Sequence, residues 1–173
     1  MVILLVGPAG SGKTTLGSRI AENKGWVHIS EDNIWNEIGH PPHALRTDAG
    51  QQVVHARADE KIRNALDAGL NVVFDFLVYE DPPLRIDAYE DSLRRSGLPF
   101  VTRVLRPSVD SILERRRARR RPSGRDVDGR RHNAEHQLTC LASIDAERVI
   151  DTSNETPEET YARHFFHLVS LSQ

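Results

Sequence analysis

Short apolar runs alternate with longer segments of helical spacing along the whole chain. The runs that predict buried strands are Val2–Val6, Trp26–Ile29, Asn71–Phe74, Phe100–Leu105 and Arg148–Ile150. Apolar runs separated by helical segments are typical of βαβ units, in which helices cover both faces of a parallel sheet. The pattern therefore predicts an α/β fold, with a five-stranded parallel sheet and helices on both faces.

The helices between these runs carry recognisable start and stop signals. Ser30 and Ser108 are positioned as N-caps, and Pro157 with Glu158 and Glu159 forms an acidic first turn. The expected helices are Lys13–Asn23, one from Ser30 to Ile38, Gly50–Ala68, Pro82–Arg95, one capped by Ser108, Ala134–Ile144 and one from Thr156. The helix that begins at Ser108 is expected to end in an arginine-rich loop.

Composition narrows the function classes. The length of 173 residues fits one domain over 1–173, and a net charge of -2 argues against a dedicated nucleic-acid coat protein. The single cysteine, Cys140, cannot form an internal disulfide, and no apolar run is long enough to span a bilayer. We expect a cytoplasmic protein with no membrane association.

The most specific motif is Gly7-Pro8-Ala9-Gly10-Ser11-Gly12-Lys13-Thr14, a full match to G-x-x-x-x-G-K-[ST] between a strand and a helix. In such a P-loop, backbone amides form an anion cradle at the positive end of a helix. The nucleotide-binding residues expected here are Gly7, Ala9, Gly10, Ser11, Gly12, Lys13, Thr14 and Thr15. Lys13 is expected on the β- and γ-phosphates, and the Thr14 hydroxyl on Mg²⁺.

The carboxylates Asp32, Asp75 and Asp151 follow three of the predicted strands, where ligands bind in a doubly wound sheet. Asp32 is placed to accept the proton of an attacking hydroxyl or to orient that hydroxyl, although an acidic first turn also stabilises the helix dipole. Asp75 is expected to bind Mg²⁺ through water or to bind the acceptor, and the alternative is a turn residue at a strand end. Phe76 stands where ATP-driven motors commonly have a Glu, which counts against a motor.

Nine arginines lie between Arg115 and Arg131. Arg115 and Arg119 share a helix face and are expected to reach phosphate oxygens, while most of the other arginines are solvated. The composition of Pro122–Gly129 is that of a mobile lid, so the lid is expected at about 115–131. A backbone track for a nucleic acid is the third interpretation of this segment.

With these motifs the sequence resembles the small P-loop kinases grouped with the phosphotransferase-like AAA proteins, which include polynucleotide 5′-hydroxyl kinase domains, chloramphenicol phosphotransferase, gluconate kinase and zeta-toxin-type kinases. Ile29–Asn33 resembles the strand-two Asp motif of the polynucleotide kinases, which implies that Asp32 is the general base. That motif has Arg where this chain has Glu31. Ile112–Arg115 with Arg119 resembles the lid helix that contacts ATP phosphates, and Asp151-Thr152-Ser153 resembles the loop that packs on adenine, so Asp151 and Ser153 are expected at the nucleotide.

The sequence thus predicts an ATP- and Mg²⁺-dependent kinase that transfers the γ-phosphoryl group to a hydroxyl of a small-molecule acceptor. Its expected catalytic residues are Lys13, Asp32, Arg115 and Arg119. The first alternative is a 5′-hydroxyl polynucleotide or tRNA kinase with a nucleic-acid substrate, and the second is a nucleotide-gated ATPase without an acceptor. Guanine specificity is disfavoured because Asn23-Lys24 is followed by Gly25-Trp26 and not by the x-Asp of an N-K-x-D element. The acceptor and the oligomeric state stay open.

Overall fold

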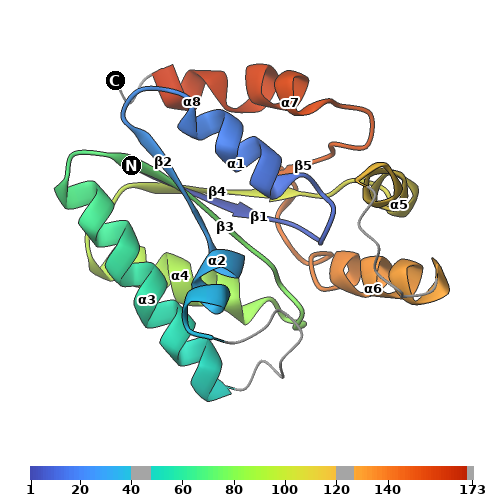
Figure 1. The fold of residues 1–173 in the computed structure, drawn as a ribbon, viewed down its shortest axis with the longest axis horizontal. Helices are drawn as coiled ribbons and strands as arrows, with labels where there is room; N and C mark the ends of the chain where they lie inside the picture. Colours follow the sequence, from blue (N-terminus) through green and yellow to red (C-terminus); the bar gives the residue numbers. More distant parts are fainter. Residues whose placement is uncertain (40–47, 120–126, 171–173) are drawn as a thin grey trace.

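A five-stranded parallel sheet forms the centre of the structure, a computed structural model that describes residues 1–39, 48–119 and 127–170 (Figure 1). The strand order is β2-β3-β1-β4-β5, and every pairing is parallel. The strands are β1 (Val2–Val6), β2 (Trp26–Ser30), β3 (Asn71–Phe76), β4 (Phe100–Leu105) and β5 (Val149–Ile150). This arrangement confirms the predicted α/β fold.

Helices cover both faces of the sheet (Figure 1). The helices are α1 (Lys13–Ala21), α2 (Glu31–Glu37), α3 (Asp48–Asp67), α4 (Leu84–Arg95), α5 (Val109–Ala118), α6 (Val127–Thr139), α7 (Pro157–His164) and α8 (Phe166–Ser170), and Ala146–Arg148 forms the short 3₁₀ turn η1. Helices α1, α7 and α8 lie on one face, and α3 and α4 lie on the other. Helices α5 and α6 lie beyond the carboxyl end of β1, next to the loop that follows it.

Alternate residues of each central strand contribute to two separate cores. Val2, Leu4 and Val6 of β1 pack toward α3 and α4, whereas Ile3 and Leu5 pack toward α1 and α7. All five of these side chains are fully buried. A strand that is buried on both faces has a continuous apolar sequence, which is why the run at Val2–Val6 was a clear strand signal.

The strand order places the loop after β1 at the middle of one sheet edge. From β1 the chain moves to β2 and β3 on one side and later to β4 and β5 on the other. Ligands bind at such a switch point in open α/β sheets, beyond the carboxyl ends of the strands. The P-loop is therefore positioned by topology as well as by its sequence.

Several element boundaries differ from those that the sequence predicted. β3 continues to Phe76 rather than ending at Phe74, so Asp75 lies within the strand and not in a turn after it. α6 begins at Val127 rather than near Ala134, so the last residues of the expected lid loop are helical. The rest of that loop, 120–126, lies outside the described residues, as does the segment 40–47.

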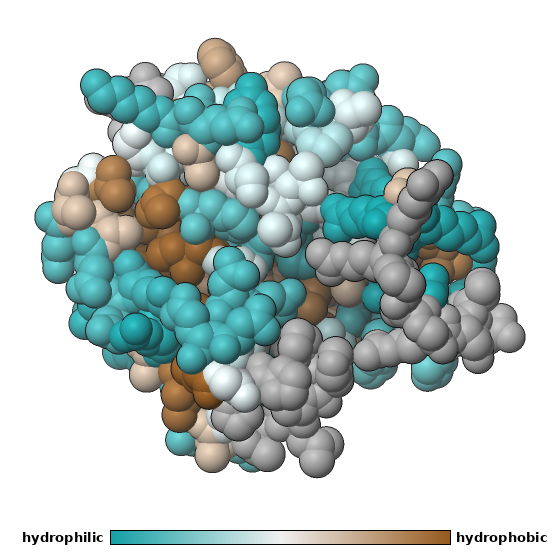
Figure 2. All heavy atoms as spheres, viewed as in Figure 1, coloured by the Kyte–Doolittle hydropathy of each residue, from teal (hydrophilic) through white to brown (hydrophobic). Residues whose placement is uncertain are grey.

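Hydrophilic residues cover most of the face seen in Figure 2, and hydrophobic residues show between them. The exposed large hydrophobic residues that the structure describes, Val53, Leu84 and Phe166, come from three different helices. Within the described ranges, no helix is both long and apolar enough to cross a bilayer.

Candidate active site

The P-loop forms a tight turn between β1 and α1. Gly10 and Gly12 have φ angles of 93° and 103°, a left-handed conformation that strongly favours glycine. A Cβ atom on Gly10 would also lie 3.0 Å from Cγ of Arg116. The amide of Ser11 donates to the carbonyl of Pro8 at 3.0 Å, which curls the chain into α1. The loop therefore brings its backbone amides to the positive end of a nine-residue helix, as an anion site requires.

Ser11 contributes a buried hydroxyl to this cradle. Its Oγ is inaccessible to solvent, and no partner for it is found among the residues that the structure describes. A buried hydroxyl without a partner is unfavourable, by about 1–3 kcal/mol, so the position suits a ligand with hydrogen-bond acceptors. A phosphate oxygen fits that description.

Lys13 lies beneath the loop with its ammonium group buried. Nζ donates to the carbonyl oxygens of Gly7 at 2.8 Å and Pro8 at 3.1 Å. Burial lowers the pKa of Lys13 to about 8, although the nearby carboxylates of Asp75, Asp32 and Glu31 act to raise it. The side chain is thus predominantly cationic at neutral pH and loses its charge as the pH rises through about 8. Three carboxylates are thus within electrostatic range of the lysine that is expected to bind phosphate.

Asp75 is a buried carboxylate held by two residues of the neighbouring strand. Ser30 Oγ donates to Asp75 Oδ1 at 2.7 Å, and His28 Nε2 lies 3.1 Å from Asp75 Oδ2. Burial acts to raise the pKa of Asp75, but the hydrogen bond from His28, the charge of Lys13 and the hydrogen bond from Ser30 outweigh it and lower the pKa. Asp75 is therefore an anion at neutral pH.

The sequence correctly predicted Ser30 as the N-cap residue of α2, but it did not indicate the partner of the Ser30 side chain. Ser30 occupies the N-cap position with extended backbone, but its side chain makes no capping hydrogen bond and donates to Asp75 instead. The carboxylate partner comes from a strand 45 residues away, so the local sequence could not reveal it.

The two acids at the start of α2 have different surroundings. Glu31 is buried, and its carboxylate accepts from the Tyr89 hydroxyl at 3.2 Å and from Arg85 Nη1 at 3.4 Å. Burial and the Glu31 charge raise the pKa of Tyr89 well above its usual value, so the phenol remains a donor. Asp32 is exposed in the first turn of α2, within electrostatic range of Lys13. Of the two carboxylates, Asp32 is the one accessible to a substrate.

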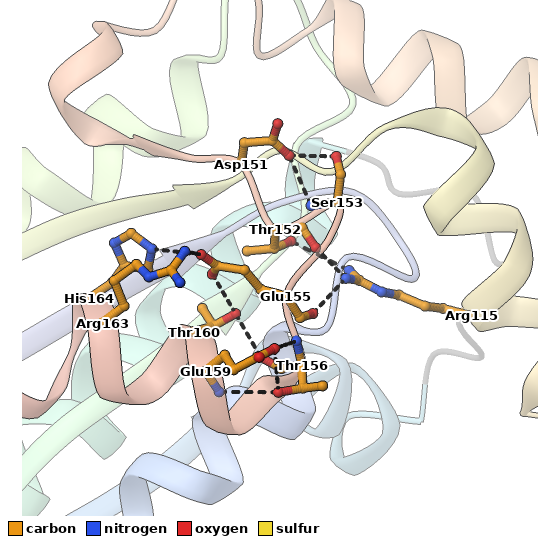
Figure 3. A network of polar contacts seen from close by, with 10 residues as sticks. All are labelled: Arg115, Asp151, Thr152, Ser153, Glu155, Thr156, Glu159, Thr160, Arg163 and His164. Carbon is orange, nitrogen blue, oxygen red and sulfur yellow. Dashed lines mark hydrogen bonds and ion pairs between the residues drawn. The ribbon is translucent and has the colours of Figure 1, made fainter.

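Arg115 binds main-chain carbonyl groups from two separate loops. Figure 3 shows its contacts with one of them, the segment that carries Thr152 and Glu155. The Arg115 side chain donates to Ser11 O at 3.1 Å, to Glu155 O at 3.1 Å and to Thr152 O. These contacts connect α5 to the P-loop and to the segment between β5 and α7. The structure thus gives Arg115 a role that the sequence did not indicate, and its expected contact with phosphate stays a prediction.

Arg119, one turn later, has a more open position. Its Nη2 donates to Thr15 Oγ1 at 3.2 Å, and the side chain is exposed. Its positive charge is close enough to lower the pKa of both Lys13 and Arg115. Arg119 therefore lies beside the P-loop with an accessible guanidinium.

Replacement of Arg115 by Ala is expected to lower the free energy of unfolding by about 1–3 kcal/mol, because three carbonyl groups lose their charged donor. The matched variant Arg119→Ala, from the same helix, is expected to change stability by less than about 0.5 kcal/mol. Denaturant unfolding of both variants measures the difference. Equal destabilisation by the two substitutions would contradict the structural role of Arg115.

A cavity of about 250 Å³ lies beside the P-loop. Its lining includes the apolar side chains of Leu16, Leu105, Ala118 and Pro157 and the polar residues Ser11 and Arg119. An apolar cleft with a polar end that opens on an anion cradle has the shape and chemistry to hold a nucleoside attached to phosphates.

Asp151 and Ser153 are not in the lining of this cavity, although their neighbours Thr152 and Glu155 are. Ser153 donates from N and Oγ to Asp151 Oδ1, at 2.9 and 2.5 Å, and accepts from the amide of Ser108 at 2.8 Å. These bonds lower the pKa of Asp151. The pair therefore fixes the junction of this loop with α5, and its expected contact with the nucleotide stays a prediction.

One functional neighbour of the P-loop gave no signal in the sequence. Gln137 of α6 is buried, and its Oε1 accepts from the amide of Ala9 at 2.7 Å. The two residues are 128 positions apart, and a glutamine within a helix has no distinctive local pattern. The amide of Ala9 is thus bound to α6 in this structure, and its expected contact with phosphate stays a prediction.

The oxygen donors near the loop fit a magnesium ion bound together with a nucleotide. Mg²⁺ usually takes one or two protein oxygen ligands and completes its shell with water and phosphate. The exposed Thr14 hydroxyl and the Asp75 carboxylate supply such oxygens at this end of the sheet. Across the described ranges, no group of three or more His, Cys, Asp and Glu side chains forms an all-protein metal cage.

Comparison with solved structures shows the fold of P-loop kinases. A gluconokinase from Sinorhizobium meliloti 1021 is 22% identical, with a TM-score of 0.65 over 99% of this chain and 93% of that chain. Shikimate kinase from Acinetobacter baumannii, in complex with shikimate, is 20% identical, with a TM-score of 0.63 over 99% and 94% of the two chains. A chain of the Pnkp1/Rnl/Hen1 RNA repair complex is 15% identical, with a TM-score of 0.59; the match covers 83% of this chain and only 46% of that one.

At the level of sequence, a family model described as an AAA domain matches residues 2–142. No curated protein matches this sequence. The matched segment contains the P-loop and β1 to β4, as well as α5 and α6. The chain therefore belongs to the AAA domain family and has the fold of the P-loop kinases.

Proposed function

We propose that this protein is an ATP- and Mg²⁺-dependent kinase that transfers the γ-phosphoryl group to a hydroxyl of a small-molecule acceptor. The observation that carries the proposal is the meeting of the P-loop, Lys13, Asp75 and Asp32 at one edge of the sheet. Hydrogen-bond donors for phosphate, the buried Asp75 carboxylate and the accessible Asp32 carboxylate therefore belong to the same region. The similarity to a gluconokinase and a shikimate kinase supports a small acceptor.

The cavity beside the P-loop supplies the nucleoside site. Its apolar wall of Leu16, Leu105 and Pro157 suits the faces of a purine ring, and its polar end adjoins the P-loop. Among the purine nucleotides, ATP is favoured because the sequence lacks an N-K-x-D element for guanine.

Different residues have different roles in the proposed phosphoryl transfer. Asp32 orients the acceptor hydroxyl and takes its proton as the new oxygen–phosphorus bond forms and the bond to the ADP leaving oxygen breaks. Lys13 and Arg119 present positive charge to the phosphoryl oxygens. Thr14 and Asp75 would hold a Mg²⁺ ion, which would supply positive charge next to the phosphates.

A polynucleotide 5′-hydroxyl kinase is the second candidate. Two observations favour it: the structural similarity to a chain of an RNA repair complex, and the arginines Arg115 and Arg116 of α5 beside the P-loop. A nucleotide-gated ATPase without an acceptor is a weaker candidate, because Phe76 stands where ATP-driven motors commonly have a Glu. The single cysteine, Cys140, is free and buried, which is consistent with the cytoplasmic location that we propose.

A screen of ATP consumption distinguishes these functions. ADP release is measured with Mg-ATP and panels of sugars, nucleosides, antibiotics and 5′-hydroxyl oligonucleotides, and the product is checked for a new phosphate ester. Stimulation by one class of small hydroxyl compound is the expected result. Stimulation by oligonucleotides alone, with affinity that falls steeply with salt, would favour the polynucleotide kinase. An ADP release rate that no alcohol changes would contradict the proposed kinase.

A further inference from the structure

A glycine in the middle of α1 faces the ring of a histidine on β2. Gly17 is buried four residues into the helix, where glycine is less stabilising than alanine. A Cβ atom at this position would lie 2.6 Å from His28 Nε2 and 2.7 Å from His28 Cδ2. No side chain fits there while the imidazole stays in place. The absence of a side chain at Gly17 therefore makes room for His28.

The imidazole that occupies this space binds Asp75. His28 Nε2 lies 3.1 Å from Asp75 Oδ2, and because an ionised carboxylate only accepts, Nε2 is the donor. On the other side of the ring, Nδ1 lies 3.5 Å from Ser18 Oγ, on the residue after Gly17. Gly17 and Ser18 of helix α1 thus lie against the ring, and the Nε2–H group of the ring is directed at the Asp75 carboxylate.

The strand register makes this contact one half of a pair. Ser30 is the partner of Asp75 in the β2–β3 register, and His28 lies two residues earlier on the same face. Ser30 binds Oδ1 at 2.7 Å, whereas His28 binds Oδ2. Each carboxylate oxygen therefore has its own donor from β2, and two such bonds fix the plane of the carboxylate as well as its position.

The geometry points to His28 as a positioning residue of the active centre, which holds the Asp75 carboxylate in the orientation needed for the Mg²⁺ that accompanies the nucleotide, with Gly17 providing its space. The inference rests on the proposed function, because it assigns Asp75 to the metal. Partners that hydrogen-bond a metal-binding carboxylate typically change metal affinity or activity by 10–100-fold when they are removed.

Metal binding to the protein–ADP complex tests the inference without a turnover assay. Mn²⁺ replaces Mg²⁺ as the probe, and its affinity is measured by calorimetry in the presence of saturating ADP. His28→Leu is expected to weaken Mn²⁺ binding by about 10–100-fold. His28→Gln, which keeps a donor on a side chain of similar reach, is expected to recover most of the affinity. ADP binding in excess chelator is expected to stay within about threefold in both variants.

The role of Gly17 has a separate readout in stability. Gly17→Ala is expected to lower the Tm of the natural protein, because the new methyl group clashes with the imidazole. In a His28→Ala background the same change is expected to raise the Tm, because alanine favours the helix. A fall of similar size in both backgrounds would overturn the claim that Gly17 makes room for His28.

The outcomes separate this inference from the proposed function. If the natural protein binds Mn²⁺ with ADP and His28→Leu binds it equally well, only the role of His28 is overturned. The role of His28 is also overturned if ADP binding in excess chelator falls as much as Mn²⁺ binding does. His28 would then be a general structural residue. Failure of the natural protein to bind ADP under any condition would overturn both proposals.

Discussion

Replacement of Asp32 by Asn is expected to lower turnover at least about 100-fold and to leave the affinity for Mg-ATP nearly unchanged. Asn keeps the size and polarity of the side chain but accepts no proton. Asp32 is exposed in the first turn of α2, so the substitution lies at the surface of the fold. Steady-state kinetics with the acceptor found by the screen, together with calorimetry of Mg-ATP, measure the two effects separately.

Glu37→Gln is the matched control, because it removes a carboxylate from the last turn of the same helix. Glu37 forms a surface ion pair with Lys61 at 3.0 Å, and such pairs contribute little to stability. Its turnover is expected to equal that of the natural protein. Normal turnover in Asp32→Asn would remove Asp32 from the mechanism.

Replacement of Lys13 by Met is expected to lower kcat by about 100- to 1000-fold and to weaken Mg-ATP binding as well. Met keeps most of the buried volume, so the effect isolates the ammonium group. Nζ reaches the carbonyl oxygens of Gly7 and Pro8, directly beneath the loop that would hold the phosphates. Calorimetry and single-turnover kinetics at neutral pH, below the pKa of about 8, measure the loss while the natural side chain is charged.

Lys24→Met is the control for this substitution. Lys24 is exposed beyond the other end of α1, far from the P-loop in the helix. The Lys24→Met substitution removes one positive charge from the protein at a position outside the site, so nucleotide affinity is expected to stay unchanged. Equal effects of the two substitutions would attribute the result to net charge and would contradict a specific phosphate contact by Lys13.

The strands were predictable because burial on both faces of a parallel sheet leaves a direct trace in the sequence. Val2–Val6 and Phe100–Leu105 were located at their observed boundaries for this reason. The P-loop was equally clear, because its glycines are required by backbone angles that few other residues adopt. The capping box of α7 at Thr156 and Glu159 is likewise a local signal. The start of α6 at Val127, in contrast, was not predicted.

The site residues show the same difference between local sequence signals and long-range contacts. Sequence alone determined the phosphate loop, the order of strands and helices along the chain, and the acidic residues at the strand ends, because these depend on neighbours a few positions away. Only the tertiary structure decided what the side chains do: Ser30 binds Asp75 from 45 residues away, and Arg115 binds Ser11 from 104 residues away. The strand order and the packing of the helices determine which distant residues become partners. A hydrogen bond between such residues leaves no pattern in the sequence around either of them.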